Sequence, residues 1–449
     1  MSVPELELEI ESLEALSAAR RTALLDRGRD RLRALREPVA RILADVRARG
    51  DTAVLECAAR YDVAPASLRV PADEIAAALA AADPAYLAAL RQACANIETF
   101  HRAQLGHLLA EPPVETAPGV CVWRVWRPLA RVGVYVPGGG ALYPSCLLMS
   151  AIPARVAGCA AVAVCTPPDA DGHVPAPVLA AAALAGVHEV YAVGGAQAIG
   201  ALAYGTATIP AVDKICGPGG SYVAAAKALV AGEVATDLPA GPSEVLVLAD
   251  GAADPAWVAA DLLAQAEHGP ESACVLVTNS ATLAERVRAE LRRQLPALAT
   301  APVIRASLRR NGALLVAATL PAAVAFANDY AAEHLEIQTA DPEAVLDGIQ
   351  HAGAVFLGGW SPVPAGDYAS GGNHTLPTAR YARGFGPLAV EAFGRRMQVQ
   401  RLGREGLDGL AASITTLAAA EGLPAHAAAA RIRFGATDAA AAPQQEAHA

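Results

Sequence analysis

The sequence contains little charge and few aromatic side chains. Charged residues make up 18% and aromatic residues 4% of its 449 residues, whereas 54% are hydrophobic. This composition excludes a disordered chain and is sufficient for two packed cores. Lysine is nearly absent, with only Lys214 and Lys227 among 35 basic residues, and the net charge is −10. Nucleic acid and anionic membrane surfaces would repel such a chain, so we expect small molecules as its main partners.

Long hydrophobic runs are also missing. The longest apolar stretches, Val174–Val187 and Ala313–Ala327, fall short of the ~20 residues that a membrane span needs. The N-terminus has neither the basic start nor the apolar core of a secretory signal. We therefore expect a cytoplasmic protein without a transmembrane segment.

Three common cofactor and metal signatures are absent. The eight cysteines form no CxxC pair, so we interpret them as reduced, packed residues, with a lone catalytic or metal-binding cysteine as the alternative. No GxGxxG motif stands between a strand and a helix, and no Walker sequence occurs. A dinucleotide would therefore need a non-standard phosphate contact.

The apolar pattern predicts a helical region followed by two α/β units. Residues 20–105 carry helical periodicity, and from Arg131 onward short β-branched runs alternate with alanine-rich helices. Such alternation is typical of parallel sheets wrapped by helices. The predicted strands are 132–136, 161–165, 189–193, 244–248, 274–278, 314–317, 336–338 and 354–357, and the predicted helices are 144–158, 175–185, 196–204, 254–267, 281–294, 321–334 and 342–350.

We therefore expect an α/β fold of two successive Rossmann-like three-layer α/β domains with helical N-terminal and C-terminal extensions. The C-terminal helical segment cannot bury its apolar face alone, so it should dock on another domain or subunit. The expected segments are a helical N-terminal region (1–127), a nucleotide-binding domain (128–243), a catalytic domain (244–386), the C-terminal helical segment (387–435) and a flexible tail (436–449).

Two segments combine histidine with amide or carboxylate side chains that suit a metal. In Asp261–Pro270, Gln265 and His268 are three residues apart and project from one helix face, so both could bind one ion. Alternatively, His268 only complements the helix dipole. Asp367 and His374 lie in a long glycine-rich loop after the last predicted strand, where function is more common than structural support.

Two further segments pair glutamate with histidine. Glu333 and His334 adjoin at the end of a predicted helix, just before a strand. Ligands in α/β units bind at carboxyl ends and turns, and an imidazole beside a glutamate could act as a base and orient a water. A surface pair without function is the alternative. Glu421 and His426 form a similar pair in the C-terminal helical region.

Three glycine-rich turns each follow a strand and precede a helix: Val136–Gly140, Val193–Ala198 and Cys216–Gly220. Backbone amides at the helix N-termini could hold phosphates there. Because the turns belong to successive strands at one sheet edge, they predict a nucleotide cleft.

Long motifs in this order resemble the histidinol dehydrogenase family. The resemblance runs from about residue 20 to 435. Its motifs are RVGVYVPGG (131–139), VGGAQAIGALAYGT (193–206), VDKICGPGG (212–220), DLPAGPSEVLVLAD (237–250), DLLAQAEHGP (261–270), AAEHLEIQT (331–339), AVFLGGWSP (354–362), AGDYASGGNHTLPT (365–378) and AAAEGLPAH (418–426).

The resemblance implies one zinc ion per subunit and a catalytic acid–base pair of Glu333 and His334. Zinc would anchor the substrate L-histidinol, and His334 would take the alcohol proton in a four-electron oxidation that uses two NAD in turn. A water activated by Glu333 would add to the intermediate aldehyde. The implied zinc ligands are Gln265, His268, Asp367 and His426, and the further substrate contacts are Ser243, His374 and Glu421.

The resemblance also implies a homodimer, an aldehyde-dehydrogenase-like architecture and an NAD site. Tyr135 and Gln197 would line the NAD site within 128–243. The C-terminal segment would cross to the partner, where Glu421 and His426 complete the other site.

Two positions depart from the family pattern. Family members usually carry asparagine where this chain has Gly220, so one NAD hydrogen bond worth about 1 kcal/mol would be missing. The turn after Pro137 lacks the common Thr or Ser after its glycine pair, which puts its cofactor contacts in question.

Three other interpretations are open. A paralogue could oxidise another polar alcohol, such as a sulfonated propanediol, with the same zinc and base. A zinc hydrolase would use Glu333 to activate a metal-bound water without NAD. A catalytically inactive regulatory homologue would carry damaged motifs, and the six catalytic and ligand positions are intact.

Overall fold

The computed structural model describes residues 8–27, 29–138, 142–237 and 241–435. These residues fall into two compact units, which are described separately. Unit 1 takes in residues up to Leu105 and Pro128–Gly394, and unit 2 takes in Gly106–Arg127 and residues from Arg395 onward. Within the described ranges, none of the helices has the length and hydropathy needed to cross a membrane.

A five-stranded parallel sheet forms one part of unit 1. Its strand order, β6-β5-β4-β7-β8, corresponds to the 3-2-1-4-5 order of doubly wound nucleotide-binding folds, with the switch point between β4 and β7. Its central strands are continuous apolar runs because helices cover both faces. The elements are β4 (Arg131–Tyr135), α6 (Pro144–Ala157), β5 (Ala161–Thr166), α7 (Ala176–Leu184), β6 (Glu189–Ala192), α8 (Gly195–Tyr204), β7 (Lys214–Cys216), α9 (Ser221–Val230) and β8 (Ala235–Thr236).

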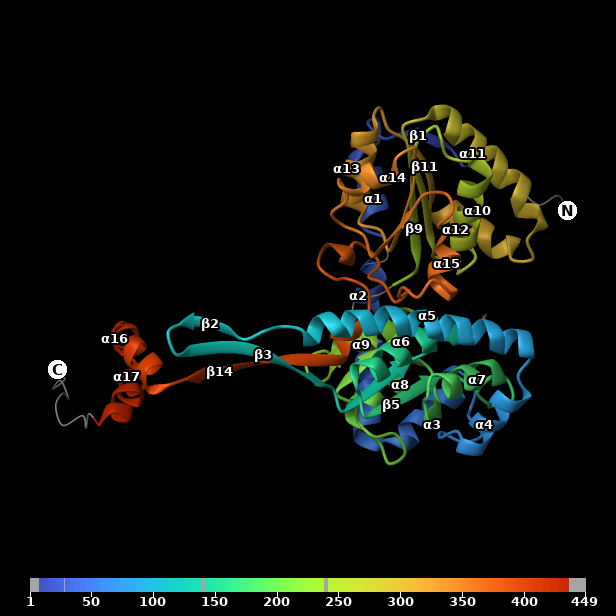
Figure 1. The fold of residues 1–449 in the computed structure, drawn as a ribbon. Coiled ribbons are helices and arrows are strands. Elements are labelled where there is room, and N and C mark those ends of the chain that lie inside the picture. The colour runs from blue at the N-terminus through green and yellow to red at the C-terminus, as the bar shows by residue number, and fades with distance from the viewer. Residues whose placement is uncertain (1–7, 28, 139–141, 238–240, 436–449) are drawn as a thin grey trace, which may run out of the picture. The chain divides into compact units, whose positions relative to one another are not determined.

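A six-stranded parallel sheet, in the order β1-β11-β10-β9-β12-β13, forms the other part, and its switch point lies between β9 and β12. Val245 and Val247 of β9 pack against α10, α11 and α12, whereas Leu246 and Leu248 pack against α1 and α13. Figure 1 shows these helices on opposite faces of the sheet. The elements are β9 (Glu244–Ala249), α10 (Pro255–Ala266), β10 (Ala273–Thr278), α11 (Ala281–Gln294), η1 (Leu295–Ala297), α12 (Ala301–Asn311), β11 (Gly312–Val316), α13 (Leu320–Tyr330), β12 (His334–Gln338), α14 (Pro342–Leu346), β13 (Ala354–Leu357), α15 (Val363–Tyr368), η2 (Tyr381–Arg383) and η3 (Val390–Phe393).

The N-terminal segment of unit 1 packs on both sheets. Strand β1 joins the edge of the six-stranded sheet beside β11, and α2, α3, α8 and α9 share one apolar core with the five-stranded sheet. The elements are β1 (Ile10–Ser12), α1 (Ala18–Leu25), α2 (Arg29–Arg49), α3 (Asp51–Tyr61), α4 (Ala72–Ala81) and α5 (Pro84–Leu109), whose last turn belongs to unit 2.

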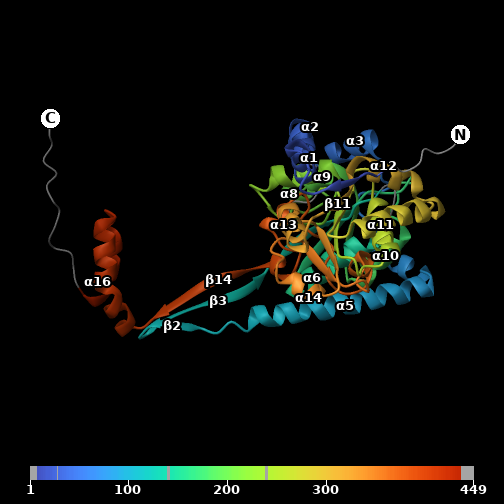
Figure 2. The same cartoon turned by 90° about the horizontal axis from the view of Figure 1, so that it is seen from above.

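Unit 2 combines a three-stranded sheet with two helices. Strands β2 (Val114–Ala117), β3 (Val120–Pro128) and β14 (Gly394–Leu402) lie side by side in the order β14-β3-β2, as Figure 2 shows. Helices α16 (Arg404–Ala420) and α17 (Pro424–Arg431) and the turn η4 (Ile432–Phe434) follow.

The structure corrects several expected elements. The segments 1–127 and 387–435 are not wholly helical, because the first contains β1, β2 and most of β3 and the second contains β14. The helix expected at 321–334 ends at Tyr330 because Ala331 adopts a left-handed conformation with φ 49°, and β12 therefore begins at His334. The helix expected at 342–350 ends at Leu346. Part of the turn Val136–Gly140 and the tail 436–449 lie outside the described residues.

Candidate active site

Glu333 and His334 lie at the switch point of the six-stranded sheet, at its amino-terminal edge. His334 is the first residue of β12 and is in register with Val245 of β9. The pair was expected at the carboxyl ends or turns of the strands; it does precede a strand as expected, but at the amino edge rather than the carboxyl edge. Helix α13 returns the chain from the carboxyl edge to the amino edge, so a residue between a helix and the next strand lies at the amino edge.

The imidazole of His334 is oriented by one hydrogen bond. Its Nδ1 lies 2.9 Å from the carbonyl oxygen of Glu244, so Nδ1–H donates and Nε2 carries the lone pair. Nε2 has no hydrogen-bond partner among the described residues and lies 3.8 Å from an Asp367 carboxylate oxygen. Burial, with nearby His268 and His374, lowers the pKa of His334 to about 3. The ring is therefore neutral at physiological pH and can accept a proton.

Glu333 is buried beside this ring. One of its carboxylate oxygens accepts the backbone N–H of Glu244 at 2.8 Å and lies 3.5 Å from Nδ1 of His334. Burial and the neighbouring carboxylate of Glu244 raise the pKa of Glu333 well above its usual value. Such a carboxylate is a stronger base than an exposed one.

Asp367 lies beside Nε2 of His334, and His268 and His374 are near the ring. Gln265, near the end of α10, is buried, and neither polar atom of its amide has a partner in the described chain. Asp367 of α15 is largely buried, which raises its pKa to about 6, while the nearby His268 counteracts this rise. An unpartnered buried amide is costly unless a ligand satisfies it, so these residues fit a metal ion or a polar substrate.

Among the described residues, there is no group of three or more His, Cys, Asp or Glu side chains that could hold a metal ion. The implied ligand set explains this result in part. One of its members is the amide of Gln265, and another, His426, belongs to unit 2.

The remaining expected substrate contacts divide between the units. His374 has an unpartnered Nε2 among described residues, and burial lowers its pKa to about 4. Ser243 directly precedes β9, and its carbonyl oxygen accepts the N–H of Ala273 at 3.1 Å. Glu421 and His426 lie in unit 2, at the end of α16 and in α17, and both are exposed.

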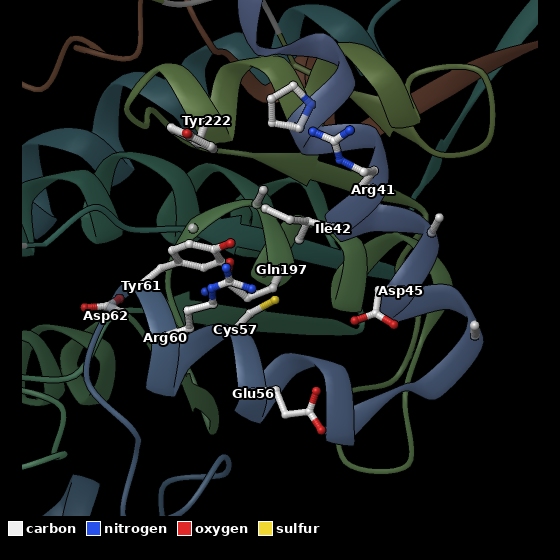
Figure 3. Close-up of a pocket in the computed structure, with 15 residues that line it drawn as sticks. Arg41, Ile42, Asp45, Glu56, Cys57, Arg60, Tyr61, Asp62, Gln197 and Tyr222 are labelled. Atoms are coloured by element: carbon white, nitrogen blue, oxygen red, sulfur yellow. The ribbon is translucent and has the colours of Figure 1, made fainter.

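A cavity of about 1020 Å³ opens beside the N-terminal turn of α8 (Figure 3). Gly195 and Gln197 of α8 line it with Tyr222 of α9, and the side chains from α2 and α3 include Arg41 and Arg60. This volume is close to the upper end, roughly 1,000 Å³, of pockets that hold small molecules and cofactors.

Tyr135 connects the glycine turns at the carboxyl edge of the five-stranded sheet. Its hydroxyl accepts the N–H of Gly195 at 3.1 Å, and burial raises its pKa to about 12. Gly217 has φ +110°, and a Cβ there would lie 2.1 Å from the carbonyl oxygen of Tyr135, so only glycine fits. Gly220 caps α9 without a side-chain hydrogen bond, and its surroundings leave space for a larger residue.

Comparison with known proteins identifies the family. The family model for histidinol dehydrogenase matches residues 25–434. Histidinol dehydrogenase from Methanosarcina barkeri is 47% identical over 424 residues, covering 94% of this chain and 97% of that protein. The enzyme from Xanthomonas campestris pv. campestris is 49% identical over 403 residues, covering 89% and 93%. A crystal structure of histidinol dehydrogenase from Elizabethkingia anophelis has a TM-score of 0.90 at 37% identity, covering 97% of this chain and 99% of that chain.

The chain belongs to the histidinol dehydrogenase family. It is therefore an oxidoreductase, and the mixed α/β fold with parallel sheets expected from the sequence is confirmed.

Two residues of the polar network around Glu333 and His334 in this histidinol dehydrogenase family member were not among the expected site residues. Glu244 opens β9 and bonds to both Glu333 and His334, and Arg27 pairs with Glu244. A charged residue directly before the apolar run of β9 was the available signal for Glu244. Arg27 had none, because its partner lies 217 positions away.

Proposed function

We propose that this chain oxidises L-histidinol to L-histidine by way of L-histidinaldehyde, with zinc and NAD as cofactors. The observation that carries the proposal is the buried, neutral imidazole of His334, whose Nε2 is unpartnered in the described chain and lies 3.8 Å from Asp367. A neutral imidazole with an available lone pair is suited to removing a hydroxyl proton. The relatives bear the name of this activity, which supports the substrate.

Zinc would be held by Gln265, His268 and Asp367 of one subunit and by His426 of the partner subunit. The unpartnered amide of buried Gln265 supports this assignment. With two neutral imidazoles, one amide and one carboxylate as ligands, the zinc site would have a net charge near +1. The ion would then act as a Lewis acid that anchors nitrogen atoms of the substrate. Ser243, His374 and Glu421 would contact the same substrate.

NAD would be held near Tyr135, Gln197 and Gly220. The cavity beside Gln197 and the hydrogen bond between Tyr135 and Gly195 support this location. When bound, NAD accepts the hydride in each of the two oxidations.

The residues of the chain perform the proton transfers. Nε2 of His334 takes the proton of the substrate hydroxyl, and its Nδ1–H bond to the Glu244 carbonyl keeps the ring oriented and stabilises the imidazolium that forms. Glu333 then takes a proton from the water that adds to the aldehyde, and because burial raises its pKa it binds this proton more tightly than an exposed carboxylate would. Burial of both groups limits competing reactions of the aldehyde with bulk water.

We further propose a cytoplasmic homodimer in which the segment 387–435 completes the partner's site with Glu421 and His426. The architecture would be aldehyde-dehydrogenase-like, with the NAD-binding domain at 128–243 and the zinc and substrate domain at 244–386. The exposed positions of Glu421 and His426 within this chain support a role toward a second subunit.

The first test is NADH formation from L-histidinol and NAD, with zinc-loaded and EDTA-treated protein side by side. Two NADH per histidinol, lost on EDTA treatment and restored by zinc, would support the proposal. The substitution His334→Gln should abolish turnover while zinc stays bound. As the matched control, His173→Gln changes a histidine that is 56% exposed and should leave turnover unchanged.

The shared site is tested by mixing two inactive variants. His426→Asn should lower zinc content, and heterodimers of this variant with His334→Gln should regain activity in one of their two sites. Lack of activity in every heterodimer would contradict the shared site. A folded, zinc-loaded dimer that makes no NADH from histidinol would direct the assay to other polar alcohols, and hydrolysis without NAD would indicate the hydrolase.

A further inference from the structure

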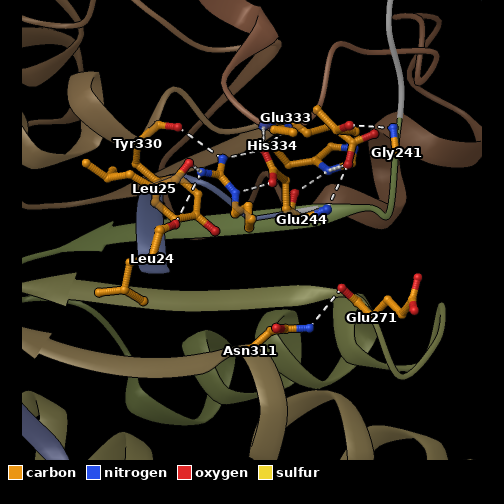
Figure 4. A network of polar contacts seen from close by, with 12 residues as sticks. Leu24, Leu25, Gly241, Glu244, Glu271, Asn311, Tyr330, Glu333 and His334 are labelled. Atoms are coloured by element: carbon orange, nitrogen blue, oxygen red, sulfur yellow. Dashed lines mark hydrogen bonds and ion pairs between the residues drawn. The ribbon is translucent and has the colours of Figure 1, made fainter. Parts of the chain in front are cut away.

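Glu244, which lies beside Glu333 and His334 in Figure 4, forms a buried ion pair with Arg27. Arg27 follows α1, and Glu244 is the first residue of β9. The side chains are only 11% and 2% exposed. The guanidinium contacts both carboxylate oxygens, with Nη2 2.6 Å from one of them and Nε bonded to the other. This two-point geometry is specific to arginine.

Further contacts hold the guanidinium of Arg27 in place. It lies over the ring of Tyr330, 3.5 Å from the ring centroid, and Nη2 donates to the carbonyl oxygen of Tyr330 at 3.0 Å. Nη1 donates to the carbonyl oxygens of Leu24 and Leu25 at 3.4 and 3.3 Å. The cation is therefore fixed by α1 on one side and by the end of α13 on the other.

Glu244 contacts both members of the acid–base pair. Its side chain accepts the N–H of Glu333 at 3.2 Å, and its own N–H donates to the Glu333 carboxylate at 2.8 Å. Its carbonyl oxygen accepts the Nδ1–H of His334 at 2.9 Å. The same carboxylate also accepts the N–H of Ala379 at 3.2 Å. Glu244 therefore fixes the main chain at Glu333 and the tautomer of His334.

The charge of Arg27 is needed for this arrangement. The carboxyl groups of Glu244 and Glu333 are close together and buried, and two like charges there are unfavourable without a cation. Loss of Arg27 would leave the buried carboxylate of Glu244 without its counter-ion, so the carboxylate would no longer be held where it accepts the two N–H groups.

We propose that Arg27 and Glu244 are a positioning pair for the acid–base pair, in which Arg27 compensates the charge of Glu244 and Glu244 orients Glu333 and His334. The roles assigned to Glu333 and His334 rest on the proposed function. Neither Arg27 nor Glu244 needs to touch the substrate.

The test compares Arg27→Ala with Arg21→Ala. Arg21 makes the same kinds of contact from the same segment, because it pairs with Asp329 at 2.6 Å and lies 5.5 Å from the Phe326 ring centroid. Arg27→Ala should lower kcat for NADH formation by roughly 100-fold with little change in KM, because misplaced groups react slowly. Arg21→Ala should leave kcat unchanged.

Rescue and conservative substitution separate positioning from a general loss of structure. Guanidinium ions at low millimolar concentration should restore part of the kcat of Arg27→Ala by filling the vacated space. Arg27→Lys keeps the charge but not the two-point contact, so its kcat should fall by only roughly tenfold. If Arg27→Ala fails to fold, Arg27→Lys carries the test, and wild-type kcat in that variant would overturn the proposal.

A double-mutant cycle tests whether the pair acts as a unit. Glu244→Gln alone leaves Arg27 buried without its carboxylate and should lower kcat as strongly as Arg27→Ala does. The double variant Arg27→Ala with Glu244→Gln should be no worse than either single variant. Additive losses would overturn the idea of one positioning unit.

A nitrogen-15 NMR measurement separates failure of this inference from failure of the proposed function. Protein labelled with nitrogen-15 histidine should show His334 protonated at Nδ1, with His334→Gln identifying the signal. Arg27→Ala should shift that signal toward a mixture of tautomers, whereas Arg21→Ala should not. If wild-type protein makes no NADH from histidinol, the proposed function fails and the NMR result alone decides the inference. An unchanged His334 signal in Arg27→Ala would overturn it.

Discussion

Two buried neutral imidazoles should make the stability of the metal-free protein fall in mild acid. Burial lowers the pKa of His334 from 6.5 to about 3 and that of His374 from 6.5 to about 4. Below pH 6.5 the unfolded chain therefore takes up protons that the folded chain excludes. The free energy of unfolding consequently decreases as the pH falls through this range.

The magnitude follows from the size of the shifts. A shift of about 3.5 pKa units for His334 corresponds to about 5 kcal/mol, and that of about 2.5 units for His374 to about 3 kcal/mol. Between pH 6.5 and 5 each imidazole should cost about 2 kcal/mol. This loss is large beside a typical stability of about 5–15 kcal/mol.

Buried carboxyl groups act in the opposite direction over part of the same range. Burial raises the pKa of Glu333 and of Glu336 well above 4.5. Above that pH the unfolded chain releases protons that the folded chain retains, so these groups reduce stability as the pH rises. The pH curve of the wild type alone therefore mixes both effects, and the difference between wild type and a histidine variant isolates the imidazole.

The assay is urea unfolding of EDTA-treated wild type and of His334→Gln at several pH values from 5 to 7.5. The stability difference between the two proteins should change by about 2 kcal/mol across this range, in favour of the variant at pH 5. His374→Gln should behave similarly. A constant difference for His334→Gln would refute the assignment of a neutral buried imidazole.

Substitutions at three further positions test the surroundings of the two sites. Asp261 forms a side-chain hydrogen bond with the buried carboxyl group of Glu336. In urea unfolding, Asp261→Asn should lower the free energy of unfolding by less than about 1.5 kcal/mol, and Asp261→Ala should lower it by about 3 kcal/mol. Equal losses for the two variants would contradict this hydrogen bond. Gly217→Ala should lower stability by about 1–3 kcal/mol and weaken NAD binding, because its Cβ would meet the Tyr135 carbonyl oxygen. Gly220→Ala, where the Cβ has open space, is the control and should leave NAD binding measured by calorimetry unchanged. Gly220→Asn should tighten NAD binding several-fold, by about 1 kcal/mol, and an unchanged Kd would show that no contact is missing there.

The parallel sheets could be predicted from the sequence because their strands are buried on both faces. The strands expected at 161–165 and 354–357 agree with β5 and β13 to within one residue. Strand β14 was missed because most of its residues are at least partly exposed, so its sequence lacks an apolar run. The end of α13 was missed because alanine, rather than glycine, occupies the left-handed position at Ala331.

The candidate site could be predicted in its residue types but not in its support. Gln265, His334 and Asp367 stood out because histidine, acid and amide side chains cluster in short motifs. Arg27 and Glu244 did not, because their ion pair joins positions far apart in the chain. Long-range pairing of this kind depends on the tertiary fold and leaves no local pattern.

The position of His334 at the start of a central strand explains how one residue can be both buried and precisely oriented. The first residue of β12 is held by the ladder with β9 on one side and β13 on the other. Its carbonyl acceptor, Glu244, is likewise the first residue of β9, so two neighbouring strand ends place the base and its orienting group together. Donors on α10 and α15 reach the same edge because each helix returns the chain to it. A loop at the carboxyl edge would allow more movement than these strand ends, and the base role proposed for His334 requires such a fixed position.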